Sequence, residues 1–361
     1  MNEQKQLAGI RSKIDALDEQ ILELVSQRAR LALEVAATKR AAGEADNFYR
    51  PEREAEVLRR LRDLNSGPLS SESVQRLFRE IMAACLALQQ PLKIAYFGPE
   101  GTFTHAAAIK HFGHSSQMLP IAAIDLVFRE VESGAADFGV VPVENSTEGV
   151  VSHTLDRFMS SPLQIVGEVE LPIVHNLASK ATELAAIRRV YSHQQALGQC
   201  RAWLDAHLPQ AERIPVSSTA EAARMAATDP EAGAIASEAA AERYIVPLLA
   251  TGIQDGSANT TRFLIIGEQS PPPTGDDKTS LVVSRTNQPG GLYRLLEPLA
   301  RYGVNMSRIE SRPSRQAMWE YVFFVDLLGH AQDAPVRQAL EEVQGQASLL
   351  KVLGSYPRAA R

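Results

Sequence analysis

The feature that most restricts the fold of this 361-residue chain is a helical repeat of apolar residues near its N-terminus. The repeat predicts one helix over about 7–41, which is longer than the helices of compact domains. A helix of that length with a single apolar stripe needs a partner helix to cover the stripe. The members of the stripe, mostly three or four residues apart, are Leu7, Ile10, Ile14, Leu17, Ile21, Leu24, Leu31 and Val35.

Basic residues on this helix predict a site shared between two chains. Arg28 and Lys39 are three helical turns apart, so they face the same way with their backbones about 16 Å apart. Long side chains can converge on a small dianion from that distance. Arg11 lies about 25 Å from Arg28 along the axis and on another face. If Arg11 serves the same kind of site, it comes from a second subunit, which predicts a symmetric homodimer. A solvated helix face is the alternative interpretation.

The rest of the first region is also expected to be helical. Two shorter helices are predicted at 51–64 and 71–89, with Gly67-Pro68 between them and Ser71 as the expected cap of the second. The resulting all-α domain is expected to span 1–91.

Composition excludes several classes of function. The net charge of −6, with no long basic run, argues against a nucleic-acid partner. No 18-residue apolar run and no apolar N-terminal signal core are present, so neither a membrane span nor secretion is expected. The two cysteines, Cys85 and Cys200, lie far apart and predict free thiols in the cytoplasm. The eight histidines show no ligand spacing, so no metal is expected. No other cofactor is expected for this chain.

After Pro91 the period changes to short strands that alternate with helices, which predicts an α/β domain over 92–268. A strand at 93–97 is followed by a glycine-rich turn and a helix start, an arrangement that binds anions through backbone N–H groups. An ordinary tight turn is the alternative there. Polar residues also follow later strands, where open α/β sheets bind ligands. We expect two lobes that grip an anion in a cleft, as in periplasmic binding proteins.

The last strand of this domain begins with Thr261 and Arg262. A hydroxyl beside a guanidinium suits acid-assisted loss of a leaving group from an anionic substrate, because the guanidinium can hold a carboxylate. The alternative interpretation, without a catalytic role, is an ordinary strand threonine next to a surface arginine.

A proline-rich linker at 269–278 leads to a third domain at 279–361. Its predicted order of strand, helix, two strands, helix and strand (279–285, 293–302, 304–311, 319–328, 334–344 and 349–355) is ferredoxin-like. A unit that only holds the dimer together is the alternative to a sensor.

The motifs of the first domain resemble the all-helical chorismate mutase family, which forms intertwined dimers. They are Arg11-Ser-Lys-Ile-Asp, Arg28-Ala-Arg-Leu, Lys39, Arg53-Glu54 and Gln89. The resemblance implies a Claisen rearrangement of chorismate to prephenate, which requires only the correct conformer and charge stabilisation at the ether oxygen. It implies that Arg28 and Arg11 of the partner subunit hold carboxylates, with Arg53 as a supporting cation. Glu54 would bind the ring hydroxyl, and Lys39 and Gln89 the ether oxygen.

Five motifs of the second domain resemble prephenate dehydratase, in order: Gly98-Pro-Glu-Gly-Thr102, Pro142-Val-Glu-Asn-Ser146, Tyr191-Ser-His-Gln194, Ala236-Ser-Glu238 and Thr261-Arg-Phe263. The implied reaction is loss of the ring hydroxyl and carbon dioxide from prephenate, giving phenylpyruvate. Thr261 is implied as the catalytic hydroxyl and Arg262 as the carboxylate clamp. The expected substrate contacts are Thr102, Asn145, Ser192, Gln194 and Ser237, while His105 and His193 are expected to be structural.

The third domain resembles the regulatory ACT domain through Gly290-Gly-Leu-Tyr293 and Glu310-Ser-Arg-Pro313. The resemblance implies binding of phenylalanine between paired subunits by Gly290, Gly291, Leu292, Glu310, Ser311 and Arg312.

As a whole the chain is similar to the bifunctional chorismate mutase–prephenate dehydratase family of phenylalanine biosynthesis. The alternatives are a dehydratase that prefers arogenate and a central domain that is a non-catalytic sensor.

Overall fold

The computed structural model describes residues 2–43, 49–256, 258–313 and 321–359. The chain divides into two compact units, Met1–Leu92 with Phe112–Gln117, and Lys93–His111 with Met118–Arg361. No described helix is long and apolar enough to cross a membrane.

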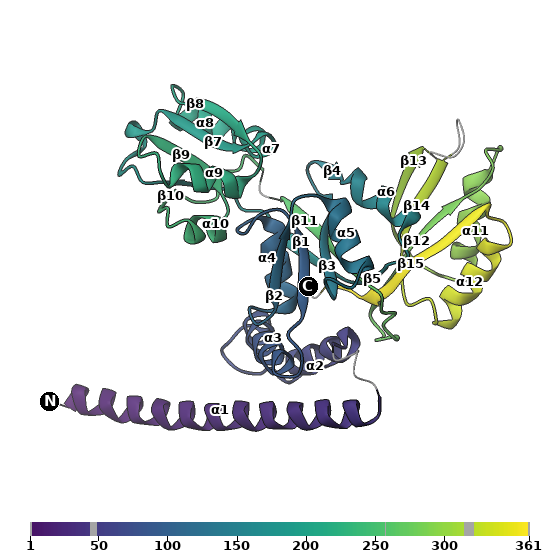
Figure 1. The fold of residues 1–361 in the computed structure, drawn as a ribbon, viewed down its shortest axis with the longest axis horizontal. Helices are drawn as coiled ribbons and strands as arrows, with labels where there is room; N and C mark the ends of the chain where they lie inside the picture. Colours follow the sequence, from purple (N-terminus) through teal and green to yellow (C-terminus); the bar gives the residue numbers. More distant parts are fainter. Residues whose placement is uncertain (1, 44–48, 257, 314–320, 360–361) are drawn as a thin grey trace. The chain divides into compact units, whose positions relative to one another are not determined.

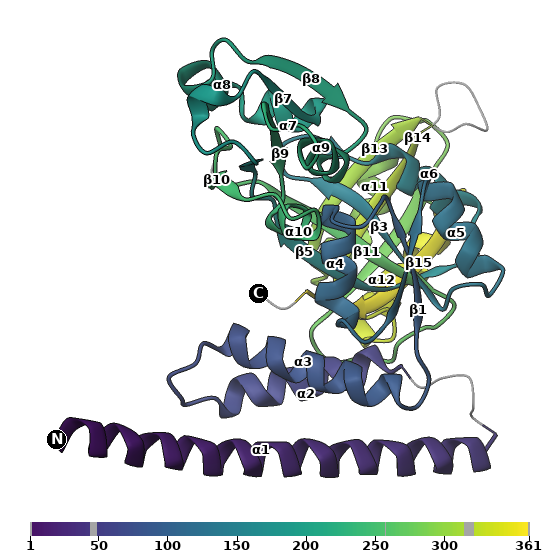
Figure 2. The ribbon, with the colours of Figure 1, turned by 60° about the vertical axis from the view of Figure 1, so that its left-hand side comes forward.

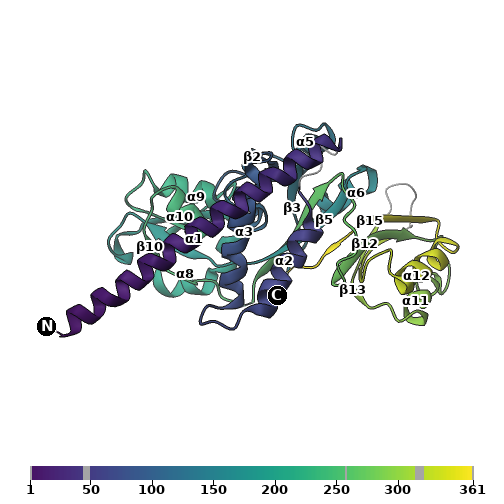
Figure 3. The same ribbon diagram turned by 90° about the horizontal axis from the view of Figure 1, so that it is seen from below.

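The first unit is built on three helices: α1 (Asn2–Ala41), α2 (Pro51–Leu64) and α3 (Ser71–Ala87). All three predicted helices are confirmed, and α1 is a single unbroken helix (Figure 3). Pro51 occupies the first turn of α2. The cap of α3 is Ser70 and not the predicted Ser71, because the Ser70 side chain accepts a hydrogen bond from the Ser73 amide.

The apolar stripe of α1 is largely uncovered in the single chain. α2 and α3 pack against each other, and α1 contacts α3 (Figure 2). The C-terminal end of α1 is tied down by Arg40, whose Nη2 donates to the Gln89 carbonyl at 2.8 Å. Each of the eight predicted stripe residues is between 48% and 63% exposed. Within one chain, much of the apolar surface of α1 therefore stays exposed to solvent.

The first lobe of the second unit contains a mixed sheet of order β2-β1-β3-β11-β5, with β4 paired to β3. β1 runs parallel to β3, whereas β11 is antiparallel to both β3 and β5. Its strands are β1 (Lys93–Phe97), β2 (Gln117–Ile121), β3 (Phe138–Asn145), β4 (Gly149–Val150), β5 (Gln164–Pro172) and β11 (Thr260–Gly267), and its helices are α4 (Phe103–Phe112), α5 (Ile124–Glu132) and α6 (Ser152–Ser160).

The second lobe contains a sheet of order β10-β6-β9-β7-β8 (Figure 1). The chain enters it after β5 and returns before β11, so two connections join the lobes, as expected for a periplasmic-binding-protein-like fold. The helical stretch between β7 and β8 is divided into two helices, since the backbone breaks at Cys200. The elements are β6 (Asn176–Ser179), η1 (Leu184–Ala186), β7 (Arg189–His193), α7 (Gln194–Gln199), α8 (Arg201–His207), β8 (Glu212–Val216), α9 (Thr219–Ala226), β9 (Ala232–Ala236), α10 (Glu238–Arg243) and β10 (Leu248–Ala250).

The C-terminal part of the unit is an antiparallel sheet of order β13-β14-β12-β15 with two helices, which confirms the ferredoxin-like prediction. We refer to it as the regulatory sheet. Its first strand begins at Asp277, inside the predicted linker, and Trp319 of the predicted third strand lies outside the described residues. The elements are β12 (Asp277–Ser284), α11 (Gly291–Arg301), β13 (Met306–Pro313), β14 (Tyr321–Leu328), α12 (Ala334–Gln344) and β15 (Leu349–Pro357).

A continuous apolar core joins the regulatory sheet to the first lobe. Val282, Phe324 and Leu353 of the regulatory sheet belong to the same buried cluster as Phe158 and Leu264 of the first lobe. The two sheets therefore pack as one body. The polar contacts described below lie at this junction.

Candidate active site

A cavity of about 940 Å³ opens between the two lobes of the second unit. Its walls come from the turn after β1, the ends of β3, β7 and β8, and the start of β11. Among its lining residues are Gly98, Thr102, Asn145, His175, Gln199, Ser217, Asn259, Thr261 and Phe263. The cavity is large enough for a small organic anion and is lined by both apolar and polar groups.

Thr261 and Asn145 form a hydrogen-bonded pair in this cavity. They are cross-strand partners on β11 and β3, and Asn145 Nδ2 donates to Thr261 Oγ1 at 2.8 Å. The Asn145 amide cannot turn over, because its Oδ1 accepts the N–H groups of Thr147 and Glu148, both at 2.9 Å. The Thr261 oxygen thus receives a hydrogen bond from the protein, and its own O–H is available to a ligand.

A chain of amides extends from this pair across the cavity wall. Asn145 Nδ2 also donates to Asn259 Oδ1 at 2.7 Å, and Asn259 Nδ2 donates to Gln199 Oε1 at 3.0 Å. Gln199 Nε2 then donates to Glu148 Oε1 at 2.9 Å. Since every donor meets an acceptor, the network has one orientation.

Four members of this network were missed in the sequence: Asn259, Gln199, Glu148 and His175. Asn259 could have been found, because it stands two residues before Thr261 and alternation places it on the same side of the extended chain. Gln199 could be identified only from the tertiary structure, because it is 60 residues from its partner Asn259 in the sequence. The motif Tyr191–Gln194 drew attention to Gln194, whereas Gln195 and Gln199 are the described glutamines that line the cavity.

His175 is buried at the first connection between the lobes, 3% exposed. Its Nε2 lies 2.8 Å from Gln199 Oε1, an acceptor, so this nitrogen carries the proton. Burial lowers the pKa of His175 and outweighs the opposing Gln199 hydrogen bond. The ring, which meets Phe103 edge-on at 5.8 Å, is therefore neutral at pH 7 and is not a ready proton donor.

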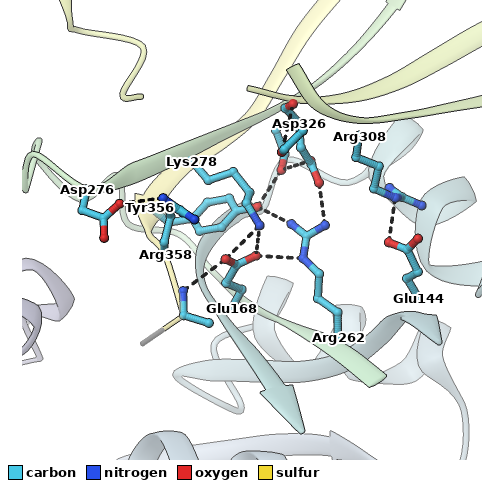
Figure 4. Close-up of polar contacts among 12 residues, drawn as sticks. Glu144, Glu168, Arg262, Asp276, Lys278, Arg308, Asp326, Tyr356 and Arg358 are labelled. Carbon is cyan, nitrogen blue, oxygen red and sulfur yellow. Dashed lines mark hydrogen bonds and ion pairs between the residues drawn. The ribbon is translucent and has the colours of Figure 1, made fainter. Parts of the chain in front are cut away.

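Arg262 does not take the position that we expected for a carboxylate clamp. Successive side chains of a strand point to opposite faces, so Thr261 and Phe263 face the cavity and Arg262 points behind the sheet. There it is 9% exposed and bonded to Glu168, Asp326 and Tyr356 (Figure 4). The two residues are adjacent in sequence but do not share one site.

Three other predicted contacts lie outside the cavity wall as the structure describes it: Ser192, Gln194 and Ser237. Ser192 Oγ is fully buried and donates to the Ile235 carbonyl. Ser237 caps α10 and donates to the Gly101 carbonyl at 3.0 Å, which ties the second lobe to the turn after β1. These two hydroxyls thus support the walls of the cavity.

One further predicted contact, Thr102, and the two histidines expected to be structural lie in or near the cavity wall. Thr102 lines the cavity, although its hydroxyl donates to the Pro99 carbonyl at 2.9 Å. His193 also lines it. His105 Nδ1 accepts the Gly101 N–H at 3.1 Å, a contact that fits its expected structural role.

In the first unit, the structure brings part of the predicted mutase set together. The Arg40–Gln89 hydrogen bond places the C-terminal end of α1, which carries Lys39, beside the segment after α3, which carries Gln89. Glu54 lies 3.1 Å from Arg79, and burial raises the pKa of Glu54 against the pull of that arginine. Arg53 is exposed and pairs with Glu56 at 2.6 Å. Arg28 is half-buried on α1, and Arg11 is exposed on it.

The regulatory sheet carries a second, smaller cavity of about 270 Å³. Gly290, Gly291 and Leu292 line it, together with Phe323 and Tyr321 of β14. Gly290 has a φ of 74°, a left-handed conformation that glycine adopts without strain.

The other predicted effector residues, Glu310, Ser311 and Arg312, lie on β13 and not in this wall. Arg312 is instead bonded within the chain to Ser152 at 2.5 Å and to Asp156 at 3.2 Å. An effector contact by these three residues is therefore not formed within one chain.

These features define a multidomain enzyme: a helical unit, a two-lobed catalytic domain with a hydroxyl–amide site, and a ferredoxin-like regulatory domain. The sequence matches the families Chorismate mutase type II over 10–90, Prephenate dehydratase over 94–271 and ACT domain over 279–345.

The chain belongs to the bifunctional chorismate mutase/prephenate dehydratase family. It is 56% identical to the bifunctional chorismate mutase/prephenate dehydratase of Stutzerimonas stutzeri over 99% of this chain and 100% of that protein. The corresponding protein of Pseudomonas aeruginosa is 55% identical over the same shares. The crystal structure of prephenate dehydratase from Arthrobacter aurescens in complex with L-Phe is 37% identical, with a TM-score of 0.69 over 74% of this chain and 90% of that chain.

Proposed function

We propose that the enzyme rearranges chorismate to prephenate in domain 1–91 and converts prephenate to phenylpyruvate in domain 92–268. Domain 279–361, after the linker 269–278, responds to phenylalanine. The observation that carries the dehydratase assignment is the Thr261–Asn145 pair in the cavity between the lobes. We place the enzyme in the cytoplasm and assign no cofactor to either reaction.

In the dehydratase step, the Thr261 O–H donates a hydrogen bond to the ring hydroxyl that leaves. The C–O bond breaks as the bond to the carboxyl carbon breaks, so water and carbon dioxide depart and the ring becomes aromatic. Threonine is too weak an acid to lose its proton outright, so it stabilises the developing charge on oxygen, and the substrate carboxyl or a relay supplies the proton. Asn145 holds the threonine in the donating orientation.

The substrate carboxylates need N–H donors at the cavity wall. The turn after β1, with Gly98 and Thr102 in the wall, precedes the N-terminus of α4. The turn at Ser217–Thr219, which also lines the cavity, precedes α9, and Ser218 caps that helix. Helix N-termini favour anions, so each lobe offers one carboxylate site. This arrangement replaces the role that the sequence predicted for Arg262.

Arogenate differs from prephenate by an amino group in place of the keto oxygen, and it remains the second candidate substrate. Rates measured side by side with the two substrates decide between them. A higher kcat/KM with arogenate would contradict the proposed preference for prephenate.

For the mutase step, we propose a homodimer in which α1 packs against α1 of the partner subunit. The exposed apolar stripe supports this arrangement, because a helix face with eight large apolar side chains is stabilised when a partner surface buries it. Arg28, Lys39, Arg53, Glu54 and Gln89 would serve one site together with Arg11 of the partner subunit. Sedimentation of the full chain as a dimer or larger oligomer is the expected outcome, and a monomer at micromolar concentration would contradict it.

For regulation, we propose that phenylalanine binds at Gly290–Leu292 with Glu310–Arg312 of a neighbouring subunit. The small cavity at Gly290 supports one half of such a site. Phenylalanine should slow formation of phenylpyruvate. Unchanged activity and unchanged oligomeric state in saturating phenylalanine would reject this part of the proposal.

The central test follows the products of chorismate over time in the purified enzyme. Transient prephenate followed by phenylpyruvate is expected, and Thr261→Ala should stop the reaction at prephenate with the mutase rate intact. Retained phenylpyruvate formation in Thr261→Ala would refute the assignment of the dehydratase site.

A further inference from the structure

The pairing of β11 with β3 places two pairs of side chains on opposite faces of one sheet. Thr261 is the cross-strand partner of Asn145, and Arg262 is the cross-strand partner of Glu144. Because side chains alternate along a strand, the Thr261–Asn145 pair faces the cavity and the Arg262–Glu144 pair lies behind it. One peptide unit on each strand joins the reacting groups to the pair behind them.

The regulatory sheet presents a matching pair to the back of these strands. Arg308 on β13 and Asp326 on β14 are themselves cross-strand partners. Arg308 Nε lies 2.7 Å from Glu144 Oε2, and Arg262 Nη1 donates to Asp326 Oδ2 at 2.5 Å. We refer to the two ion pairs Glu144–Arg308 and Arg262–Asp326 as the clasp, and Figure 4 shows both.

A buried set of charges surrounds the Arg262 half of the clasp. Arg262 Nε donates to Glu168 Oε2 at 2.7 Å, and Lys278 donates to the same oxygen at 2.7 Å. Arg262 Nη2 donates to the Tyr356 hydroxyl at 2.8 Å. The two cations and two carboxylates of this set have side chains that are 10% exposed or less. Separating one partner would leave an uncompensated buried charge, so the set holds together or rearranges as a whole.

The same regulatory strands lead to the proposed effector site. Phe323 of β14 lines the small cavity beside Gly290, and Asp326 follows it three residues later. Arg308 stands two residues before Glu310 on β13, on the same face of the strand. A ligand that shifts β13 or β14 against the first lobe therefore has to move both regulatory members of the clasp.

We propose that Arg262 and Glu144 are positioning residues, and that the clasp carries the effector signal to the Thr261–Asn145 pair. With the clasp closed, β11 and β3 hold the threonine hydroxyl where the leaving group needs it. Binding of the effector shifts the regulatory sheet, and the two ion pairs of the clasp transmit this shift to β3 and β11. The Thr261 hydroxyl is thereby displaced. The signalling part rests on the proposed regulation by phenylalanine, whereas the positioning part rests on the geometry of the dehydratase site alone.

The test removes the half of the clasp that is more exposed to solvent. Arg308→Gln and Glu144→Gln delete the same ion pair from its two sides, and Arg308→Lys preserves the charge. The matched control is Lys351→Met, because Lys351 Nζ also joins the regulatory sheet to the first lobe, through the Phe158 and Ser161 carbonyls, but away from the clasp. For each full-length variant, kcat and KM for prephenate, inhibition by phenylalanine and direct phenylalanine binding are measured, with the thermal melting curve as the folding control.

We expect both Gln variants to lose about tenfold in kcat with little change in KM, because misplaced reacting groups affect the transition state more than ground-state binding. Phenylalanine should still bind them, but the coupling between effector and activity, typically about 5- to 150-fold, should shrink to below about twofold. Arg308→Lys and Lys351→Met should remain inhibited.

Two results would overturn the clasp. One is full inhibition by phenylalanine in both Gln variants, and the other is an unchanged kcat in both. Loss of inhibition in Lys351→Met as well would assign the effect to general loosening of the interface and would also reject the proposal. If phenylalanine neither binds nor inhibits the unaltered enzyme, the proposed regulation fails, and kcat of the Gln variants alone decides the positioning role.

Discussion

Replacing Asn145 with aspartate tests whether the threonine hydroxyl works as an oriented donor. Asn145→Asp keeps the oxygen that accepts from Thr147 and Glu148, so the turn after β3 is preserved. It places a carboxylate oxygen where Nδ2 stood, 2.8 Å from Thr261 Oγ1 and 2.7 Å from Asn259 Oδ1. The Thr261 hydrogen then has to point at that carboxylate, and only lone pairs face the substrate.

The size of the effect follows from the loss of one positioned donor. Removing such a donor from a developing oxyanion costs on the order of 10²–10³ in kcat, or about 3–4 kcal/mol. Asn145→Ala removes the same amide without capturing the Thr261 proton. Its expected loss is nearer to one ordinary hydrogen bond, about 1 kcal/mol or fivefold to tenfold. The expected order of kcat is therefore wild type, then Asn145→Ala, then Asn145→Asp.

The assay measures formation of phenylpyruvate from prephenate, with chorismate consumption by the same preparation as the internal control. A double-variant cycle with Thr261→Val adds a second criterion. If both changes act through one hydroxyl, the double variant should be little worse than Thr261→Val alone. A kcat for Asn145→Asp within threefold of wild type, or full additivity with Thr261→Val, would refute an oriented threonine donor.

Four further outcomes are expected. Acid should destabilise the second unit through two buried carboxylates. Burial alone would raise the pKa of both, but Arg262 and Lys278 hold the pKa of Glu168 below 4.5. Arg262 and Ser280 likewise hold the pKa of Asp326 below 3.8. The unfolded chain binds these protons first, so the free energy of unfolding in urea should fall as pH drops below about 4.5, and less steeply in Asp326→Asn; equal slopes would contradict this. Gly354→Ala should lower the free energy of unfolding by at least about 2 kcal/mol, because the added Cβ would lie 2.2 Å from the Ile165 carbonyl oxygen. Gly198→Ala, with open space at its Cβ, should be neutral or stabilising. Similar melting curves for the two variants would count against the packing described. Burial raises the pKa of Cys200 to about 12, so a thiol reagent at pH 8 should leave it unmodified in the native enzyme and label it after unfolding. Ile14→Lys and Leu17→Lys in the α1 stripe should dissociate the proposed dimer and abolish mutase activity while dehydratase turnover persists, and an intact dimer would show that this stripe is not the interface.

Much of the fold was determined by local pattern. The stripe on α1 has a helical period, and the element bounds followed from it within a few residues. Strand β1 and helix α12 were predicted with their observed bounds, because a short apolar run beside glycine and a Pro-started amphipathic stretch are local signals. The Thr261–Asn145 site was also within reach of the sequence, since both residues belong to motifs at strand ends.

What the sequence alone left open was the direction of side chains and the identity of their distant partners. Thr261 and Arg262 are neighbours in the chain, and their proximity suggested a common site, yet the pleat of β11 sends them to opposite faces. Of the two carboxylates that neutralise Arg262, Glu168 lies 94 residues away on β5 and Asp326 lies 64 residues away on the regulatory sheet. Likewise, Gln199 at the end of α7 meets Asn259 across 60 residues, because the connection that leads back to β11 passes the end of this helix. Periodicity determined which elements form, whereas tertiary packing alone decided which face of each strand meets substrate and which meets the regulatory sheet.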